Sequence, residues 1–265
     1  MPALLAEKDG HVLTVTINRP EKKNAVNAEV LCGLSDAWHR LDEDDELRVA
    51  ILTGAGDVFC AGMDLSVIPK LRARQADDEY EERLLSDGAV IFDGWLKTYR
   101  PTKPIIAAVE GYALAGGTEI LQGTDIRVAA ESAQFGVTEV QRSLFPMAGS
   151  TVRLPRQIPY TVAVEMLVTG EPISATRAAG LGLVGRVVPD GQALAEAQGI
   201  AERIAANGPL AVKAILKTIR ETATLPEEEA FAKEMANGMP VMSSQDAAEG
   251  PKAFLEKRAP VFQGR

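Results

Sequence analysis

The sequence predicts an α/β protein, with a mixed core followed by a helical C-terminal module. Two observations predict this class. Strand-like and helix-like segments alternate in the first part of the chain, and from residue 157 onward the pattern is mostly helical. We therefore divide the chain into an α/β core of residues 1–190, which holds the functional site, and a helical module of residues 191–265.

The first predicted elements follow from periodicity. Residues 11–18 alternate apolar and polar side chains, as a strand with one buried face does. Residues 27–42 repeat apolar side chains at helical spacing, and a strand at 48–53 ends in the turn residues 54–57. The charged segment 69–100 has helical spacing with interruptions, which predicts a surface excursion or a lid.

The middle of the chain contains the most apolar strand. Residues 104–110 (PIIAAVE) are almost wholly apolar, which is typical of a strand buried on both faces. A Gly-rich run, a helix from about Thr118 and a strand at 125–130 follow. The helical part after this strand is punctuated by Pro or Gly at 170–174, 180–190, 207–209 and 237–240.

Composition excludes several functions. The net charge of −9 argues against nucleic acid as a partner, because phosphate binding needs a basic field. The longest weakly polar stretch, 104–123, is broken by Glu110 and Glu119, so we expect no membrane span. The first ten residues lack the features of an export signal, and we expect a cytoplasmic protein. Two cysteines are too few for a disulfide framework. The two histidines, His11 and His39, lie in no Gly-rich or acidic cluster, which argues against a catalytic triad and a histidine-based metal site.

Two segments share one form, a buried strand followed by a Gly-rich turn and a helix start. They are FCAGMDL at 59–65 and GYALAGGTE at 111–119. Two unpaired backbone N–H groups that face each other would form an oxyanion hole. The alternative is that both are ordinary turns whose glycines serve packing. Neither segment matches a dinucleotide fingerprint or a P-loop, and no nucleophile elbow is present.

Five segments together resemble the crotonase (enoyl-CoA hydratase/isomerase) superfamily, in order and over nearly the whole chain. They lie at 59–65, 108–120, 129–140, 168–189 and 253–263. The resemblance implies a ββα spiral core with a helical C-terminal trimerisation module. Within the family, the segments GTEILQGTDIRVA, RQIPYT and NGPLAVKAILKTIRET are similar to actinobacterial, including mycobacterial, hydratases of steroid side-chain degradation.

Two glutamates match the family's acid–base positions. Taken alone, Glu119 reads equally well as an acid near a helix start, and Glu139 as a surface loop acid. In hydratases of the family both positions are glutamate, whereas isomerases commonly keep only the one matching Glu139. The resemblance therefore implies that Glu139 is the principal acid/base and that Glu119 activates or orients water. The N–H groups of Met63 and Gly116 would hold the thioester oxygen.

The implied reaction adds water across the C2=C3 bond of a trans-2-enoyl-CoA to give a 3-hydroxyacyl-CoA. The similarity to hydratases of steroid side-chain degradation implies a bulky steroid acyl group as the candidate. Two neighbouring carboxyl groups resist joint ionisation, so we expect them to share a proton. Coenzyme A enters as part of the substrate, and no metal or redox cofactor is implied. An enoyl-CoA isomerase and a catalytically silent acyl-CoA-binding protein remain as alternatives.

The resemblance also implies the coenzyme A contacts. The carbonyl of Ala61 would receive the adenine amino group, and its motif neighbours Asp64, Leu65 and Gly117 would help to bind substrate. Lys257 would reach the phosphates, often from a neighbouring subunit, although a solvated helix-end lysine is the alternative. Many relatives carry a lysine shortly after the aspartate, where this chain has Ser66 and Val67. The remaining candidates for phosphate contact are Lys70, Arg72 and Arg74.

Met147 is a second departure, because many hydratases have glycine there, in a loop that helps to hold the water. The candidate acyl-pocket residues, for which core packing is the alternative, are Trp95, Tyr99, Leu144 and Phe145. The family usually forms trimers or dimers of trimers, and we expect a homo-oligomer. The apolar positions that could face a partner are Phe231, Met235, Met239 and Met242.

Overall fold

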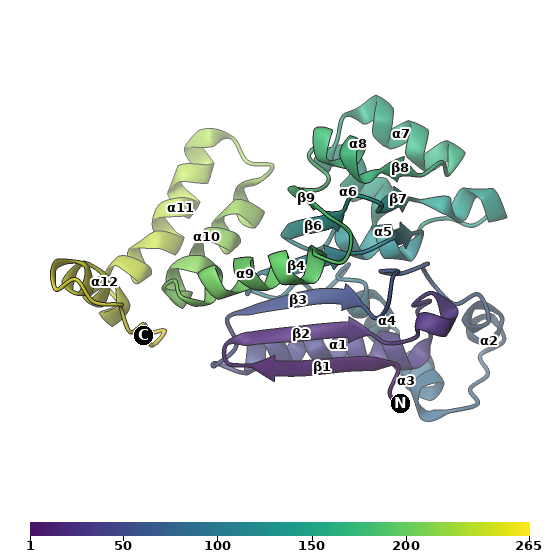
Figure 1. Ribbon diagram of the computed structural model, residues 1–265, viewed down its shortest axis with the longest axis horizontal. Coiled ribbons are helices and arrows are strands. Elements are labelled where there is room, and N and C mark those ends of the chain that lie inside the picture. Colours follow the sequence, from purple (N-terminus) through teal and green to yellow (C-terminus); the bar gives the residue numbers. More distant parts are fainter.

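The computed structural model describes residues 1–265. Nine strands form two sheets, and the last three helices follow one another at the C-terminal end (Figure 1). The strands are β1 (Leu4–Asp9), β2 (Val12–Ile17), β3 (Val49–Gly54), β4 (Ile105–Val109), β5 (Tyr112–Leu114), β6 (Ile126–Ala130), β7 (Gln134–Gly136), β8 (Ile173–Ser174) and β9 (Arg186–Val188). The α-helices are α1 (Ala28–Glu43), α2 (Val67–Ala73), α3 (Glu79–Ser86), α4 (Ala89–Gly94), α5 (Gly116–Leu121), α6 (Ser150–Gln157), α7 (Tyr160–Thr169), α8 (Ala175–Gly180), α9 (Ala193–Ala205), α10 (Pro209–Thr222), α11 (Glu227–Met242) and α12 (Gln245–Leu255). Two 3₁₀-helices, η1 (Pro20–Lys22) and η2 (Thr138–Arg142), complete the chain.

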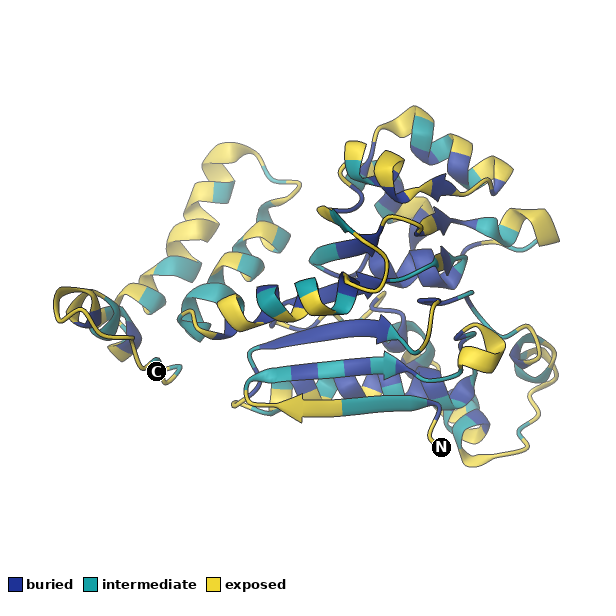
Figure 2. Cartoon of the chain, viewed as in Figure 1, coloured by how far each residue is buried: buried dark blue, intermediate teal, exposed yellow.

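The larger sheet has the order β1-β2-β3-β4-β6-β9, in which only the β1–β2 pair is antiparallel. Helix α1 covers one face and α9 the other (Figures 1 and 2). Strand β3 shows both faces being buried. Its Ala50 and Leu52 join the core on the α1 side, and Val49 and Ile51 join the core on the α9 side. The continuous apolar run of this strand follows from that double burial.

The smaller sheet brings two distant segments together. Strand β4 leads within three residues to β5, and β6 leads in the same way to β7. Strands β5 and β7 then pair in parallel, with Leu114 opposite Gly136. Because β5 and β7 are parallel, the segments that follow them leave the sheet in the same direction, and α5 and η2 begin side by side. The predicted glutamates lie on these two elements.

Most predicted elements are confirmed. The helix expected at 27–42 and the strands expected at 11–18, 48–53, 104–110 and 125–130 lie within about one residue of their predicted positions. The N-terminal strand β1 and the short strands β5, β7, β8 and β9 were not predicted. The charged segment 69–100 contains the short helices α3 and α4 and most of α2, which begins at Val67.

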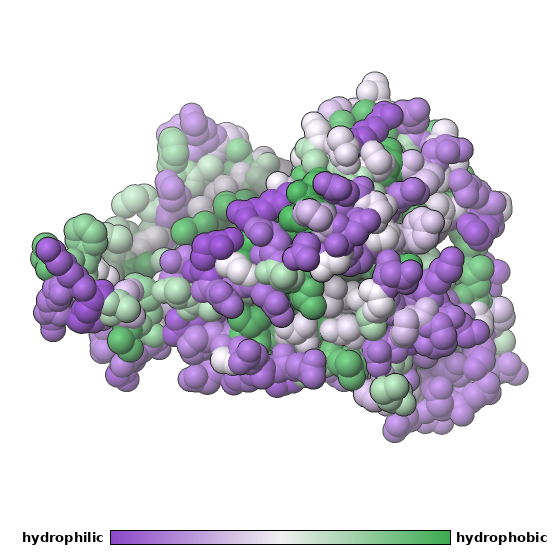
Figure 3. All heavy atoms as spheres, in the orientation of Figure 1, coloured by the Kyte–Doolittle hydropathy of each residue, from purple (hydrophilic) through white to green (hydrophobic).

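The last three helices, α10, α11 and α12, lie outside the core. The predicted boundary at residue 190 falls just before α9, but α9 packs on the larger sheet, so the protruding part begins at α10. Helices α10 and α11 pack against each other and bury no residue fully (Figure 2). Apolar side chains gather at this end of the molecule (Figure 3). The exposed ones are Ile215, Ile219, Phe231, Met235, Met239, Met242, Phe254 and Leu255. None of the helices has the length and apolarity that crossing a membrane requires.

Candidate active site

The two Gly-flanked loops lie against each other. The N–H of Leu114 donates to the carbonyl of Cys60 at 2.9 Å, so the two segments run side by side. A Cβ atom on Gly62 would lie 2.8 Å from the Cβ of Ala115 and 3.1 Å from the amide nitrogen of Gly116. Gly62 has a φ of 96°, and only glycine permits both this torsion and this close approach.

Two backbone donors are free at this contact. The N–H groups of Met63 and Gly116 have no acceptor in the protein, although their neighbours Asp64 and Ala115 donate at 2.8 and 2.7 Å. Ala115 has a φ of 50°, a conformation that is strained for a residue with a side chain and that clusters at functional sites. The expectation that both amides begin a helix is wrong for Met63, because α2 begins at Val67.

A cavity of about 590 Å³ opens in front of these donors. Seven of the predicted site residues line it, and these are Ala61, Met63, Leu65, Gly116, Glu119, Glu139 and Met147. Asp64 and Gly117 do not. Asp64 pairs with Arg19 at 3.1 Å, and a Cβ on Gly117 would lie 2.4 Å from the carbonyl oxygen of Cys60. The structure gives these two residues a supporting position in place of a contact.

Glu119 projects from α5 into the end of this cavity. Its side chain is buried, and its Oε1 accepts a hydrogen bond from the backbone N–H of Ser150 at 3.0 Å. A carboxylate in such a place requires a donor, because burial of an unpaired charge is costly. The bond also fixes where the second oxygen points, so Glu119 is held in one orientation.

Glu139 approaches the same point from η2. Its carboxyl group lies near enough to Glu119 to interact with it electrostatically, and its Oε2 is buried without a partner. Burial, and then the neighbouring Glu119 charge, raise the pKa of Glu139 to about 8. At neutral pH this raised pKa favours the protonated, neutral form of Glu139. The reading of Glu139 as a plain surface acid is excluded by this setting.

We expect this raised pKa to make stability depend on pH. The folded state holds the Glu139 proton more tightly than the unfolded state, so this contribution is complete below the unfolded pKa near 4.5 and is lost as pH rises through about 8. The thermal midpoint of the wild type should therefore fall more steeply than that of Glu139→Gln between about pH 5 and about pH 9. Parallel melting curves over this range would contradict the raised pKa.

Three of the four candidate acyl-pocket residues line the cavity. Trp95, Leu144 and Phe145 line the cavity. Tyr99 does not, because its ring stacks on His39 at 4.1 Å and its hydroxyl donates to Asp42 at 2.7 Å. The prediction of Tyr99 as a pocket residue is therefore wrong. The side chains of Leu65, Phe145 and Met147 are exposed and form an apolar rim.

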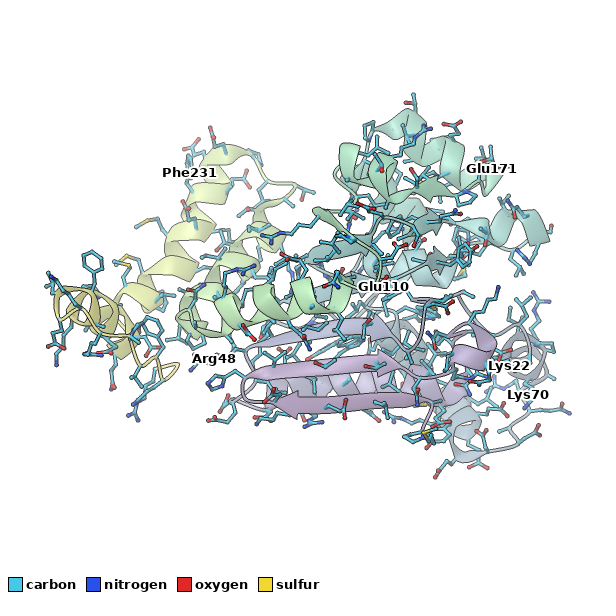
Figure 4. The ribbon with its side chains drawn as sticks, in the orientation of Figure 1. Lys22, Arg48, Lys70, Glu110, Glu171 and Phe231 are labelled. Carbon is cyan, nitrogen blue, oxygen red and sulfur yellow. The ribbon has the colours of Figure 1, made fainter.

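The basic side chains near the cavity differ in whether they form ion pairs. Lys70 (Figure 4) pairs with Asp77 at 2.8 Å and with Glu81 at 2.7 Å. Arg72 lines the cavity and has no ion pair, whereas Arg74 is exposed and does not line it. Lys257 follows α12, at the opposite end of the molecule from α2 (Figure 1). Its expected contact from a neighbouring subunit stays a prediction.

One charged lining residue, Arg142, was not predicted. It lies three residues after Glu139 on η2, and side chains at this spacing share a face in a 3₁₀-helix. The i, i+3 spacing of Glu139 and Arg142 is visible in the sequence. It indicates a shared face only once this segment is known to be a 3₁₀-helix. The chain has no cluster of three or more His, Cys, Asp or Glu residues that could hold a metal ion.

The whole chain is similar to known proteins. A family model described as Enoyl-CoA hydratase/isomerase matches residues 7–265. The chain belongs to this family. It is 54% identical to Enoyl-CoA hydratase EchA19 of Mycobacterium tuberculosis, over 100% of this chain and 97% of that protein. It is 37% identical to the Carnitinyl-CoA dehydratase of Salmonella typhi, over 97% of each chain.

Solved structures of the enoyl-CoA hydratase/isomerase family also match over the full length of the chain. The enoyl-CoA hydratase EchA1 of Mycobacterium marinum superposes with a TM-score of 0.88 at 46% identity, over 100% of both chains. An enoyl-CoA hydratase of Mycobacterium tuberculosis H37Rv gives 0.89 at 45% identity, again over 100% of both chains. The predicted family and the crotonase fold class are confirmed. The predicted class of enzyme, a hydro-lyase acting on acyl-CoA, agrees with the names of these relatives.

Proposed function

We propose that this protein is an enoyl-CoA hydratase, which adds water to a trans-2-enoyl-CoA to give a 3-hydroxyacyl-CoA. One observation carries the proposal. Two carboxyl groups, one of which (Glu139) has a raised pKa, share a cavity with two unpaired backbone N–H groups. An isomerase needs only one acid/base residue, so the buried and oriented Glu119 favours hydration.

The two carboxyl groups divide the proton transfers. The thioester oxygen accepts hydrogen bonds from the Met63 and Gly116 N–H groups, which stabilise the negative charge that develops there. Glu119, as the carboxylate, takes a proton from water while the water oxygen bonds to C3. Glu139, as the acid, donates its proton to C2. A proton then passes from Glu119 to Glu139 within the pair, and the starting state is restored.

The acyl group is proposed to be bulky, with a steroid side-chain acyl-CoA as the candidate. A cavity of about 590 Å³ is large for a short acyl chain and lies within the usual range for drug-sized ligands. Its apolar rim of Leu65, Phe145 and Met147 would contact the part of a large acyl group that extends beyond the cavity. Arg72, a cavity-lining cation without an ion pair, is the proposed contact for a coenzyme phosphate.

A panel of substrates tests this function. Crotonyl-CoA, longer straight-chain enoyl-CoAs and a steroid side-chain enoyl-CoA are each followed by loss of the enoyl thioester absorbance, and the product mass is measured. Gain of one water, with kcat/KM rising towards the bulky substrate, is the expected result. A product of unchanged mass would indicate an isomerase, and binding without any product would indicate a silent acyl-CoA-binding protein.

The working enzyme is proposed to be a homotrimer or a dimer of trimers in the cytoplasm, with no metal or redox cofactor. The exposed apolar side chains of α10, α11 and α12 support an oligomer, because monomers seldom leave so many together in water. Phe231 marks this surface on α11 (Figure 4).

A further inference from the structure

The chain segment 94–97 is held in a strained shape behind the Gly116 amide. The Trp95 indole packs on Gly116 so closely that a Cβ there would lie 2.7 Å from the indole Cη2. The next residue, Leu96, is fully buried and has a φ of 55°, which is unfavourable for a branched side chain. Such a conformation persists only where its surroundings fix it.

Arg153 on α6 supplies part of that fixation. Its Nη2 donates to the carbonyl of Leu96 and also, at 3.4 Å, to the carbonyl of Lys97. Its Nη1 is buried without a partner and lies beside Gly123, where a Cβ would be only 3.1 Å away. On the other side of the strained segment, Trp38 Nε1 donates to the carbonyl of Gly94 at 3.1 Å.

The same helix also holds the carboxylate. The first residue of α6, Ser150, donates its N–H to Glu119 Oε1, and Arg153 lies one turn later. The charge of Arg153 interacts favourably with Glu119. Burial, and then the nearby Arg100, lower the pKa of Arg153 to about 10, so the guanidinium stays charged at neutral pH.

We infer that Arg153 is a positioning residue that links the Trp95 support of the oxyanion amide to the helix that orients Glu119. The inference rests on the proposed function, because it concerns the alignment of that site. Arg153 touches neither the cavity nor the reacting atoms. Its effect is to keep the donor at Gly116 and the carboxylate at residue 119 in fixed relative positions, and misplacement by about 1 Å can cost about 10²-fold in rate.

The test compares three variants for kcat, KM, tryptophan emission and thermal midpoint. Arg153→Gln should lower kcat for crotonyl-CoA by up to about 10²-fold with little change in KM. It should also shift the tryptophan emission, because Trp95 lies in the 94–97 segment and Trp38 donates to Gly94. Arg153→Lys should recover only part of kcat. Lysine keeps the positive charge, but its ammonium group cannot reproduce the hydrogen-bond geometry of the planar guanidinium. Arg156→Gln, on the exposed face of the same helix, is the matched control and should resemble the wild type.

Two results would overturn the inference. One is a full kcat in Arg153→Gln with unchanged emission. The other is a loss of kcat that follows only the unfolded fraction and is equal in the Gln and Lys variants. If Arg153→Gln does not fold, the kcat and the tryptophan emission of Arg153→Lys test the inference instead. A wild type that hydrates no enoyl-CoA would refute the proposed function separately, and the emission shift would still test the positioning.

Discussion

Glu139→Gln is expected to lower kcat for enoyl-CoA hydration by about 10²–10⁴-fold. Glutamine has nearly the same shape and occupies the buried site without charge, but it cannot donate the proton to C2. The fold should be unaffected, because the raised pKa of Glu139 already favours a neutral side chain at neutral pH. Steady-state rates with crotonyl-CoA measure the loss, and thermal melting shows that the variant is folded.

The control is Glu171→Gln, an exposed carboxylate on the outer edge of the molecule (Figure 4). It removes a charge of the same sign without touching the cavity, so its kcat should match that of the wild type. A Glu139→Gln enzyme that keeps near-full activity would show that another group supplies the C2 proton.

Gly62→Ala is expected to lower kcat by about 10²–10³-fold, the usual cost of losing one oxyanion donor. The new Cβ would lie 2.8 Å from the Ala115 Cβ and 3.1 Å from the Gly116 nitrogen, so the two loops must separate. Separation moves the Met63 and Gly116 N–H groups away from their common target. The substitution leaves both glutamates in place, and the rate of crotonyl-CoA hydration measures the effect.

Gly182→Ala separates this effect from backbone strain. Gly182 also has a positive φ, of 78°, but nothing lies within 4 Å of its Cβ position. Both substitutions carry a conformational cost, whereas only the one at Gly62 changes the distance between the two loops. Equal losses of activity in the two variants would mean that the Met63 and Gly116 amides do not bind the thioester oxygen.

The sequence predicted the core and the two loops because their signals are local. Apolar runs such as 104–110 identify buried strands, and Gly-rich turns identify places where the backbone comes close to another group. The short strands β5 and β7 escaped prediction because three residues carry no periodicity. Their pairing, which places Glu119 beside Glu139, is a contact between distant segments that only the family resemblance indicated in advance.

The electrostatic details also depend on tertiary contacts. The sequence predicted that two neighbouring carboxyl groups share a proton, but the burial that raises the pKa of Glu139 follows only from the fold. Arg153 and Leu96 are ordinary residues in sequence, and their roles follow from hydrogen bonds across more than fifty positions. Tyr99 shows the opposite error, since an aromatic residue near the site packs elsewhere.

The double variant Glu119→Gln/Glu139→Gln tests most directly whether the two carboxyl groups act on one reaction. Groups that act as a unit lose activity together, so the double variant should be about as slow with crotonyl-CoA as Glu139→Gln alone. Losses that multiply, or a double variant that still hydrates at near the wild-type rate, would contradict a single site built from this pair.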